Sequence, residues 1–157
     1  MDILKLTKEF AKKEYAKQDK EHGWKHISEV MDTALQLAKS YPEVDLEILK
    51  LAVLLHDVSY FNYETHVEES IKTAEKFLHN KAYPKDKIKK VLDVMIAHSG
   101  PHRRKLGDTK LIEGKIIYDS DKYVRSHTLE GMQKYYPRFY LNETRELLKK
   151  TRPELFK

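Results

Sequence analysis

The chain has 157 residues, of which 40% are hydrophobic and 35% charged, and its formal net charge is +5. This length is typical of one ordinary domain with a core of its own, so we expect a single domain over residues 1–157. Cysteine is absent, which excludes a disulfide framework, a thiolate zinc site and a thiol nucleophile. No apolar stretch approaches the roughly 18 residues of a membrane span, and residues 1–16 lack the apolar run of a signal peptide. We therefore expect a cytoplasmic protein.

Apolar residues recur at three- and four-residue spacing through most of the chain, which predicts helices. A turn with a capping-box pattern stands at 40–43, and Ser99-Gly100-Pro101 predicts a break followed by a loop. No stretch alternates as a strand would, so the expected fold class is all-α. The predicted helices span residues 24–40, 45–55, about 65–79, about 85–98, 111–124, 127–136 and 142–150.

The dipeptide His56-Asp57 stands where the buried apolar run 48–55 ends. An imidazole and a carboxylate that are buried side by side cost free energy unless another group pairs with them. A divalent cation is one such partner. The pair is therefore a candidate for metal binding.

Three more titratable residues, His26, His98 and Asp121, fall on the apolar faces of their predicted helices. Taken singly, each is more simply a hydrogen-bonded core residue or a helix cap. Together they are better explained by one shared site, because an unpaired buried polar group costs about 1–3 kcal/mol. Imidazole and carboxylate ligands without a thiolate suit Mn, Fe, Co, Ni, Zn or Mg.

The order of these residues resembles the HD-domain superfamily of metal-dependent phosphohydrolases, in which a helical His precedes an apolar run into His-Asp and a distant Asp follows. Residues 19–30 resemble the opening segment of small stand-alone HD proteins, 54–58 the central motif and 117–123 the late Asp segment. The resemblance implies a helical bundle of the HD type, with a motif-bearing core over about 19–124 and a helical extension over 125–157.

The resemblance also implies that His26, His56, Asp57 and Asp121 are the primary metal ligands. Asp119 competes for the last role, but residues two apart do not share a helix face, so only one of them faces the metal. Asp121 is preferred because Asp121-Lys122-Tyr123 matches the family's Asp-basic-apolar segment. Asp119 is then expected to cap a helix or to support the ligands.

Some HD proteins bind a second metal through two further histidines, and His66 and His98 stand where those would be. Asp57 would then bridge two ions. In the alternative with one metal, His66 and His98 bind substrate phosphate or water instead. His22 stands four residues before His26, so we expect it behind the ligands or in the pocket lining.

Positive charge beside such a site suits a substrate that carries phosphate. The preferred clamp is His102-Arg103-Arg104, in the loop expected after His98, although a solvated basic loop explains these residues equally well. The aromatic residues 60–63 are able to stack a nucleobase or to pack over helix ends. The candidates for holding phosphate are Lys25, Lys122, Arg103, Arg104 and Arg125.

By this resemblance the chain is expected to be a metal-dependent phosphohydrolase that acts on a nucleotide or another small phosphate ester or anhydride. Substrate, metal and oligomeric state, including a homo-oligomer, stay open. One alternative is an HD-fold di-iron oxygenase, which requires both His66 and His98 as ligands. Others are a non-catalytic regulator that binds metal and nucleotide, and a nucleic-acid-binding module, for which we find no continuous basic stripe.

Overall fold

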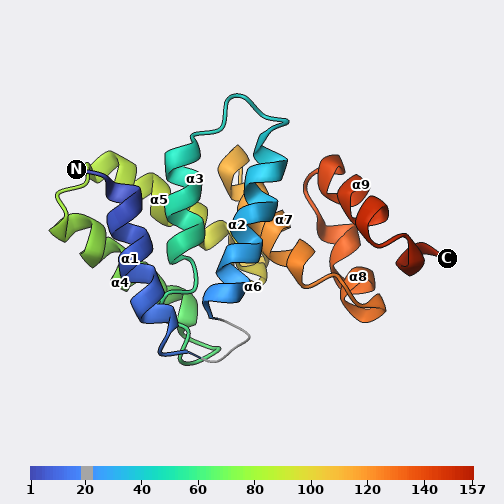
Figure 1. Ribbon diagram of the computed structural model, residues 1–157, viewed down its shortest axis with the longest axis horizontal. Helices are drawn as coiled ribbons and strands as arrows, with labels where there is room; N and C mark the ends of the chain where they lie inside the picture. Colours follow the sequence, from blue (N-terminus) through green and yellow to red (C-terminus); the bar gives the residue numbers. More distant parts are fainter. Residues whose placement is uncertain (19–22) are drawn as a thin grey trace.

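The computed structural model describes residues 1–18 and 23–157 (Figure 1). Within these residues the chain forms helices only, which confirms the all-α prediction. None of the described helices is long and apolar enough to cross a membrane. The helices are α1 (Ile3–Tyr15), α2 (Trp24–Ala38), α3 (Leu46–Leu55), α4 (His66–Asn80), α5 (Lys85–Ala97), α6 (Gly100–Leu106), α7 (Ile112–Val124), α8 (Leu129–Tyr135), the 3-10 helix η1 (Tyr136–Arg138), α9 (Asn142–Thr151) and the 3-10 helix η2 (Pro153–Phe156).

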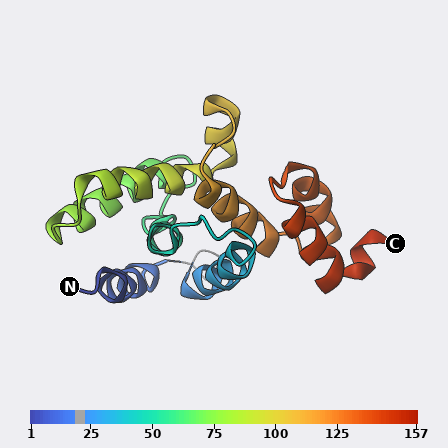
Figure 2. The ribbon, with the colours of Figure 1, turned by 90° about the horizontal axis from the view of Figure 1, so that it is seen from above.

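Helix α3 lies at the centre of the molecule because nearly all of its side chains are apolar. From Ile48 to Leu55 only Lys50 is not fully buried. Helices α1, α2, α5 and α7 pack around it, and Figure 2 shows α3 between α1 and α2 on one side and α4 and α5 on the other. The two polar residues that follow α3 are therefore carried into the interior.

Helix α3 begins within one residue of its predicted start at Asp45, but its cap differs from the predicted one. The capping-box pattern at 40–43 does not cap the helix; Asp45 does, and its side chain accepts a hydrogen bond from the backbone N–H of Ile48 at 3.1 Å. A short Asp side chain satisfies an N–H group that the first helical turn leaves without a partner. The predicted turn at 40–43 is thus only the connection before the cap.

The loop expected after Ser99 is also wrong, since these residues form α6. The Ser99 side chain accepts a hydrogen bond from the backbone N–H of His102, and Pro101 stands in the first turn. Proline is tolerated there because the first N–H groups of a helix have no partner within the helix. A Gly-Pro pair that indicates a break by itself is here the start of a helix, and the basic residues that follow are held on it.

The C-terminal helices α8, η1 and α9 gather at one end of the molecule, beside α7 (Figure 2). They share a small apolar cluster built on Tyr123, Phe139 and Leu148, separate from the main core. The buried Asp119 of α7 accepts hydrogen bonds from the backbone N–H groups of Tyr140 (2.8 Å) and Leu141 (2.9 Å). This carboxylate therefore fastens the C-terminal segment to α7.

Candidate metal centre

The candidate ligands come from five helices that meet at one place. His56 is the residue that ends α3, Asp57 follows it, and His98 ends α5 in the same way. Side chains at helix ends are able to point past the helix into the space where several helices converge. The remaining ligands are His26 in the first turn of α2, His66 at the start of α4 and Asp121 in α7.

The first group of ligand atoms consists of His26, His56, Asp57 and Asp121, all of them buried, with one ligand atom from each lying within 4.8 Å of the others. The Nε2 atom of His26 lies 3.0 Å from Oδ1 of Asp121. The Nε2 atom of His56 lies 3.4 Å from Oδ2 of Asp57 and 3.8 Å from Oδ1 of Asp121. Four such atoms are enough to surround one ion.

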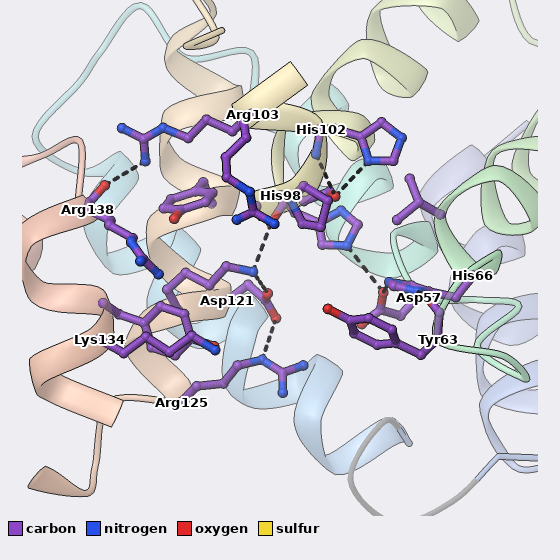
Figure 3. A pocket seen from close by; sticks show the side chains of 18 of the residues that line it. Asp57, Tyr63, His66, His98, His102, Arg103, Asp121, Arg125, Lys134 and Arg138 are labelled. Atoms are coloured by element: carbon purple, nitrogen blue, oxygen red, sulfur yellow. Dashed lines mark hydrogen bonds and ion pairs between the residues drawn. The ribbon is translucent and has the colours of Figure 1, made fainter. Parts of the chain in front are cut away.

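A second group shares Asp57 with the first and adds His66 and His98. Oδ1 of Asp57 lies 3.3 Å from Nε2 of His98 and 3.8 Å from Nε2 of His66, whereas Oδ2 faces His56. Figure 3 shows His66 and His98 directed toward Asp57. The two oxygens of one carboxylate thus face different groups, as in a carboxylate that bridges two ions.

The backbone orients three of the histidine rings in the same way. The Nδ1–H of His56 donates to the carbonyl oxygen of Val53 (2.8 Å), and that of His66 donates to Tyr63 (2.7 Å). The Nδ1–H of His98 donates likewise to the carbonyl of Met95. Because a carbonyl only accepts, the proton stays on Nδ1 and Nε2 keeps its lone pair for a metal.

Two of these buried atoms have no hydrogen-bond partner among the described residues. They are Nε2 of His56 and Oδ1 of Asp57, one from each half of the dipeptide. Leaving such atoms unpaired in the interior is costly, and a divalent cation would satisfy both. The donor set of imidazole nitrogen and carboxylate oxygen therefore fits a divalent metal.

The charges around the site keep both carboxylates ionised. Burial alone would raise the pKa of Asp121, but Lys122 and Arg125 outweigh it and hold that pKa well below its usual range. Burial of Asp57 is likewise outweighed by His56 and His98, so its pKa is lowered. Burial lowers the pKa of His98, which favours the neutral imidazole. Ionised carboxylate and neutral imidazole are the forms that bind metals.

The His56 ring differs, because its neighbours are the two carboxylates. Burial would lower its pKa, yet Asp57 and Asp121 together raise it. The same two charges that favour a proton on this ring favour a cation at its Nε2 atom. A metal ion and a proton thus compete for one position.

Tyr15 of α1 and Gln18, three residues further along, support the turn at His56-Asp57, which no feature of the sequence indicated. The Tyr15 hydroxyl donates to the carbonyl of Leu54 (2.8 Å) and accepts from the N–H of Asp57 (3.3 Å). The Gln18 amide donates to the carbonyls of Asp57 (3.1 Å) and Val58 (2.8 Å). These partners are about forty positions apart in the chain, so no local sequence pattern predicts the contacts between them.

A cavity of about 810 Å³ opens beside the ligands, and Asp57, His66, His98 and Asp121 contribute to its lining. Two predicted phosphate-binding residues form ion pairs with Asp121. Lys122 Nζ lies 2.8 Å and Arg125 Nε 3.7 Å from its carboxylate. The lining also contains further side chains from three segments: Tyr60 and Tyr63, then His102, Arg103 and Arg104 of α6, and finally Lys134 and Arg138 of the C-terminal segment.

Three predicted residues lie elsewhere. Lys25 is exposed on α2 and does not contribute to the cavity, because it stands one position before His26 and so points about a quarter turn away. Asp119 is buried against the C-terminal segment, so its support goes to the fold rather than to the ligands. His22 falls outside the described residues.

Lys134 and Arg138 were not among the predicted site residues. They stand in a segment with weak periodicity and no recognisable motif, and they reach the cavity only because α8 and η1 fold back beside α7. The basic character of the segment was visible in the sequence, but its position was not.

A family model for the HD domain matches residues 23–126, about two-thirds of the chain. The chain belongs to the HD-domain family. HD domains bind divalent metals and are generally hydrolases, and the buried histidines and aspartates of this HD protein form a cluster that could hold a metal ion. No curated protein and no solved structure matches the chain.

Proposed function

We propose that this HD protein is a metal-dependent phosphohydrolase that cleaves a phosphoester or phosphoanhydride bond of a small phosphorylated substrate such as a nucleotide. The observation that carries the proposal is Asp57, whose two oxygens face two groups of ligand atoms at the edge of a cavity lined with cationic side chains. Metal ligands and positive charge in one cavity suit an anionic phosphoryl group.

In this proposal His26, His56, Asp57 and Asp121 hold one divalent ion, while Asp57, His66 and His98 hold a second. The arrangement supports two ions over one, because His66 and His98 both direct Nε2 toward the oxygen of Asp57 that has no hydrogen bond. Ions held in this way would lower the pKa of a water ligand and neutralise charge on a phosphoryl oxygen.

The protein's own residues then have separate tasks. Lys122 and Arg125 fix the Asp121 carboxylate, and Lys122 also donates to the carbonyl of His98 (2.9 Å), which ties α7 to the end of α5. Arg104 lines the cavity with an exposed side chain and is able to meet a phosphate oxygen, whereas Arg103 is engaged with Asp108 at 2.8 Å. Charge and position are the main means by which proteins stabilise phosphoryl transfer.

A di-iron oxygenase is the second candidate, because it requires both His66 and His98 beside Asp57 and the structure brings them there. The two candidates differ in what they consume. An oxygenase needs iron and takes up oxygen during turnover, whereas a phosphohydrolase works with redox-inert ions such as Mg²⁺ or Zn²⁺ and without oxygen. Assays under nitrogen with each ion separate them.

The test is elemental analysis of the purified protein, followed by phosphate-release assays on nucleotides and small phosphate esters with added metals. We expect Asp57→Ala to lose bound metal and to lower hydrolysis by roughly 100-fold or more, because both ligand groups share this residue. Helical content, measured by circular dichroism, should be largely kept. Asp93→Ala, at an exposed position of α5, is the matched control and should retain both metal and activity. Full metal occupancy in Asp57→Ala would contradict the assignment.

A further inference from the structure

The cavity has a second wall that lies outside the residues matched by the family model. The match ends at residue 126, whereas Lys134 and Tyr135 of α8 and Arg138 of η1 also line the cavity. In Figure 3, Lys134 and Arg138 lie on the opposite side of the cavity from Asp57 and His66. A molecule that extends from the candidate metal centre across the cavity would therefore meet the C-terminal segment.

This second wall is held in place by α6. The Arg103 side chain donates to the backbone carbonyl of Arg138 at 2.7 Å, and its guanidinium stacks over the rings of Tyr140 and Tyr118, at 3.9 and 4.8 Å from their centres. Arg103 also pairs with Asp108 at 2.8 Å. Arg103 is thus a structural link between α6 and η1, and the side chain of Arg138 takes no part in that link.

Positive charge on this side of the cavity is not neutralised. Lys134 and Arg138 line the cavity and are exposed, and no carboxylate of the described residues lies within ion-pair distance of them. We call these two residues the distal basic cluster. Near the candidate metal centre, by contrast, Lys122 and Arg125 form ion pairs with Asp121, which neutralises part of their charge. Unpaired cations that face one concave space attract an anion to it.

We infer that the distal basic cluster binds a second phosphate of the substrate, and hence that the substrate contains at least two linked phosphates. The inference rests on the proposed function, which places the first phosphate at the metal centre. A phosphate monoester would leave the distal basic cluster without an anion, whereas a di- or triphosphate chain would reach it. The volume of about 810 Å³ is in the range of sites that enclose a whole small molecule.

Hydrolysis of such a substrate is balanced without a further reactant. The oxygen of a water molecule bonds to the phosphorus at the metal centre, and the bond from that phosphorus to the bridging oxygen breaks. The bridging oxygen keeps the electron pair and leaves with the distal phosphate, and the two protons of the water pass to the products or to solvent. The distal basic cluster would hold the leaving phosphate, whose negative charge grows as that bond breaks.

The test compares two substrates in one variant. In Lys134→Ala/Arg138→Ala we expect kcat/KM for inorganic tripolyphosphate to fall at least about tenfold, because two charge-assisted contacts to the distal phosphates are lost. The value for p-nitrophenyl phosphate, a monoester, should stay within about twofold. Lys150→Ala/Lys157→Ala removes the same charge from exposed positions of the same segment outside the cavity and should change neither value. An equal fall for both substrates in the first variant would overturn the inference.

A second readout does not depend on turnover. Isothermal titration calorimetry with methylene diphosphonate, which has no cleavable bridge, should show at least about tenfold weaker binding to Mn²⁺-loaded Lys134→Ala/Arg138→Ala than to the unaltered protein. Metal content, measured on the same samples, should be equal. If this difference appears but no phosphate compound is hydrolysed, the inference holds and the proposed function fails. If hydrolysis occurs but both proteins bind the diphosphonate equally, the proposed function holds and the inference fails.

Discussion

At the scale of single residues, the site depends on the hydrogen bond that three histidine rings make through Nδ1. His56, His66 and His98 each give Nδ1–H to the carbonyl three residues earlier, so that three rings from three helices present Nε2 toward Asp57 or Asp121. A ring held in this way loses little rotational freedom on binding a ligand. The backbone at the helix ends therefore prepares the site before any ion enters.

This arrangement predicts which substitution removes which ion. In His98→Ala we expect bound metal to fall from two ions per chain toward one, because the second group keeps only His66 and the shared Asp57. His26→Ala should spare that second group and weaken the first. Elemental analysis after extensive dialysis measures both ratios, and His79→Ala, an exposed histidine of α4, is the control. Two retained ions in His98→Ala would show that His98 is not a ligand.

At the scale of elements, α7 performs two tasks on two faces. Asp121 points to the candidate metal centre, while Asp119, two positions earlier, receives N–H groups from the segment that enters α9. Thr144 of α9 also donates its hydroxyl to Asp119. The helix geometry that separates residues two apart makes this division possible. Helix α7 thereby couples the centre to the segment that carries the distal basic cluster.

Asp119→Ala is expected to weaken this attachment. One buried and one partly buried backbone N–H group and one hydroxyl lose their acceptor. Each buried unsatisfied donor costs about 1–3 kcal/mol, part of which water entering the gap recovers. We therefore expect the free energy of unfolding, measured by urea titration, to fall by about 2–4 kcal/mol. The exposed Asp93→Ala should change it by less than about 0.5 kcal/mol. An unfolding free energy as high in Asp119→Ala as in this control would show that the attachment is unimportant.

At the scale of the whole molecule, the candidate metal centre lies where several helices of the apolar core converge. Its ligands come from α2, the ends of α3 and α5, the start of α4, and α7. Ions bound by the two ligand groups would together link all five helices in the folded chain, and the unfolded chain holds no such set together. Metal binding should therefore stabilise the fold.

Removal of metal by a chelator is expected to lower the melting temperature. At a free metal concentration 100-fold above the dissociation constant, binding adds about 2.7 kcal/mol, which corresponds to roughly 5–10 °C for a chain of this size. Differential scanning calorimetry with and without chelator measures the shift. In Asp57→Ala the chelator should have almost no effect. A chelator shift that is the same in both proteins would place the stabilising ion somewhere other than this centre.

The fold class, the family and the main candidate site residues were determined by the sequence alone, through helical periodicity and the order of the His and Asp residues. These two features predicted the all-α fold and the HD family, because a buried apolar run that ends in His-Asp is a local pattern that can be recognised in the sequence without the fold. They also singled out His26, His56, Asp57, His66, His98 and Asp121, which the structure brings together, and whose role as ligands stays a prediction.

Only the tertiary structure decided what surrounds these residues. Tyr15 and Gln18 hold the turn at Asp57, and Lys134 and Arg138 face it across the cavity, although neither pair stands near it in the sequence. The Ser99-Gly100-Pro101 sequence likewise indicated a loop, but a capped helix forms there and carries Arg103 to the C-terminal segment. Such contacts depend on how separate helices dock, and docking follows from the shapes of whole helix faces rather than from any spacing along one of them.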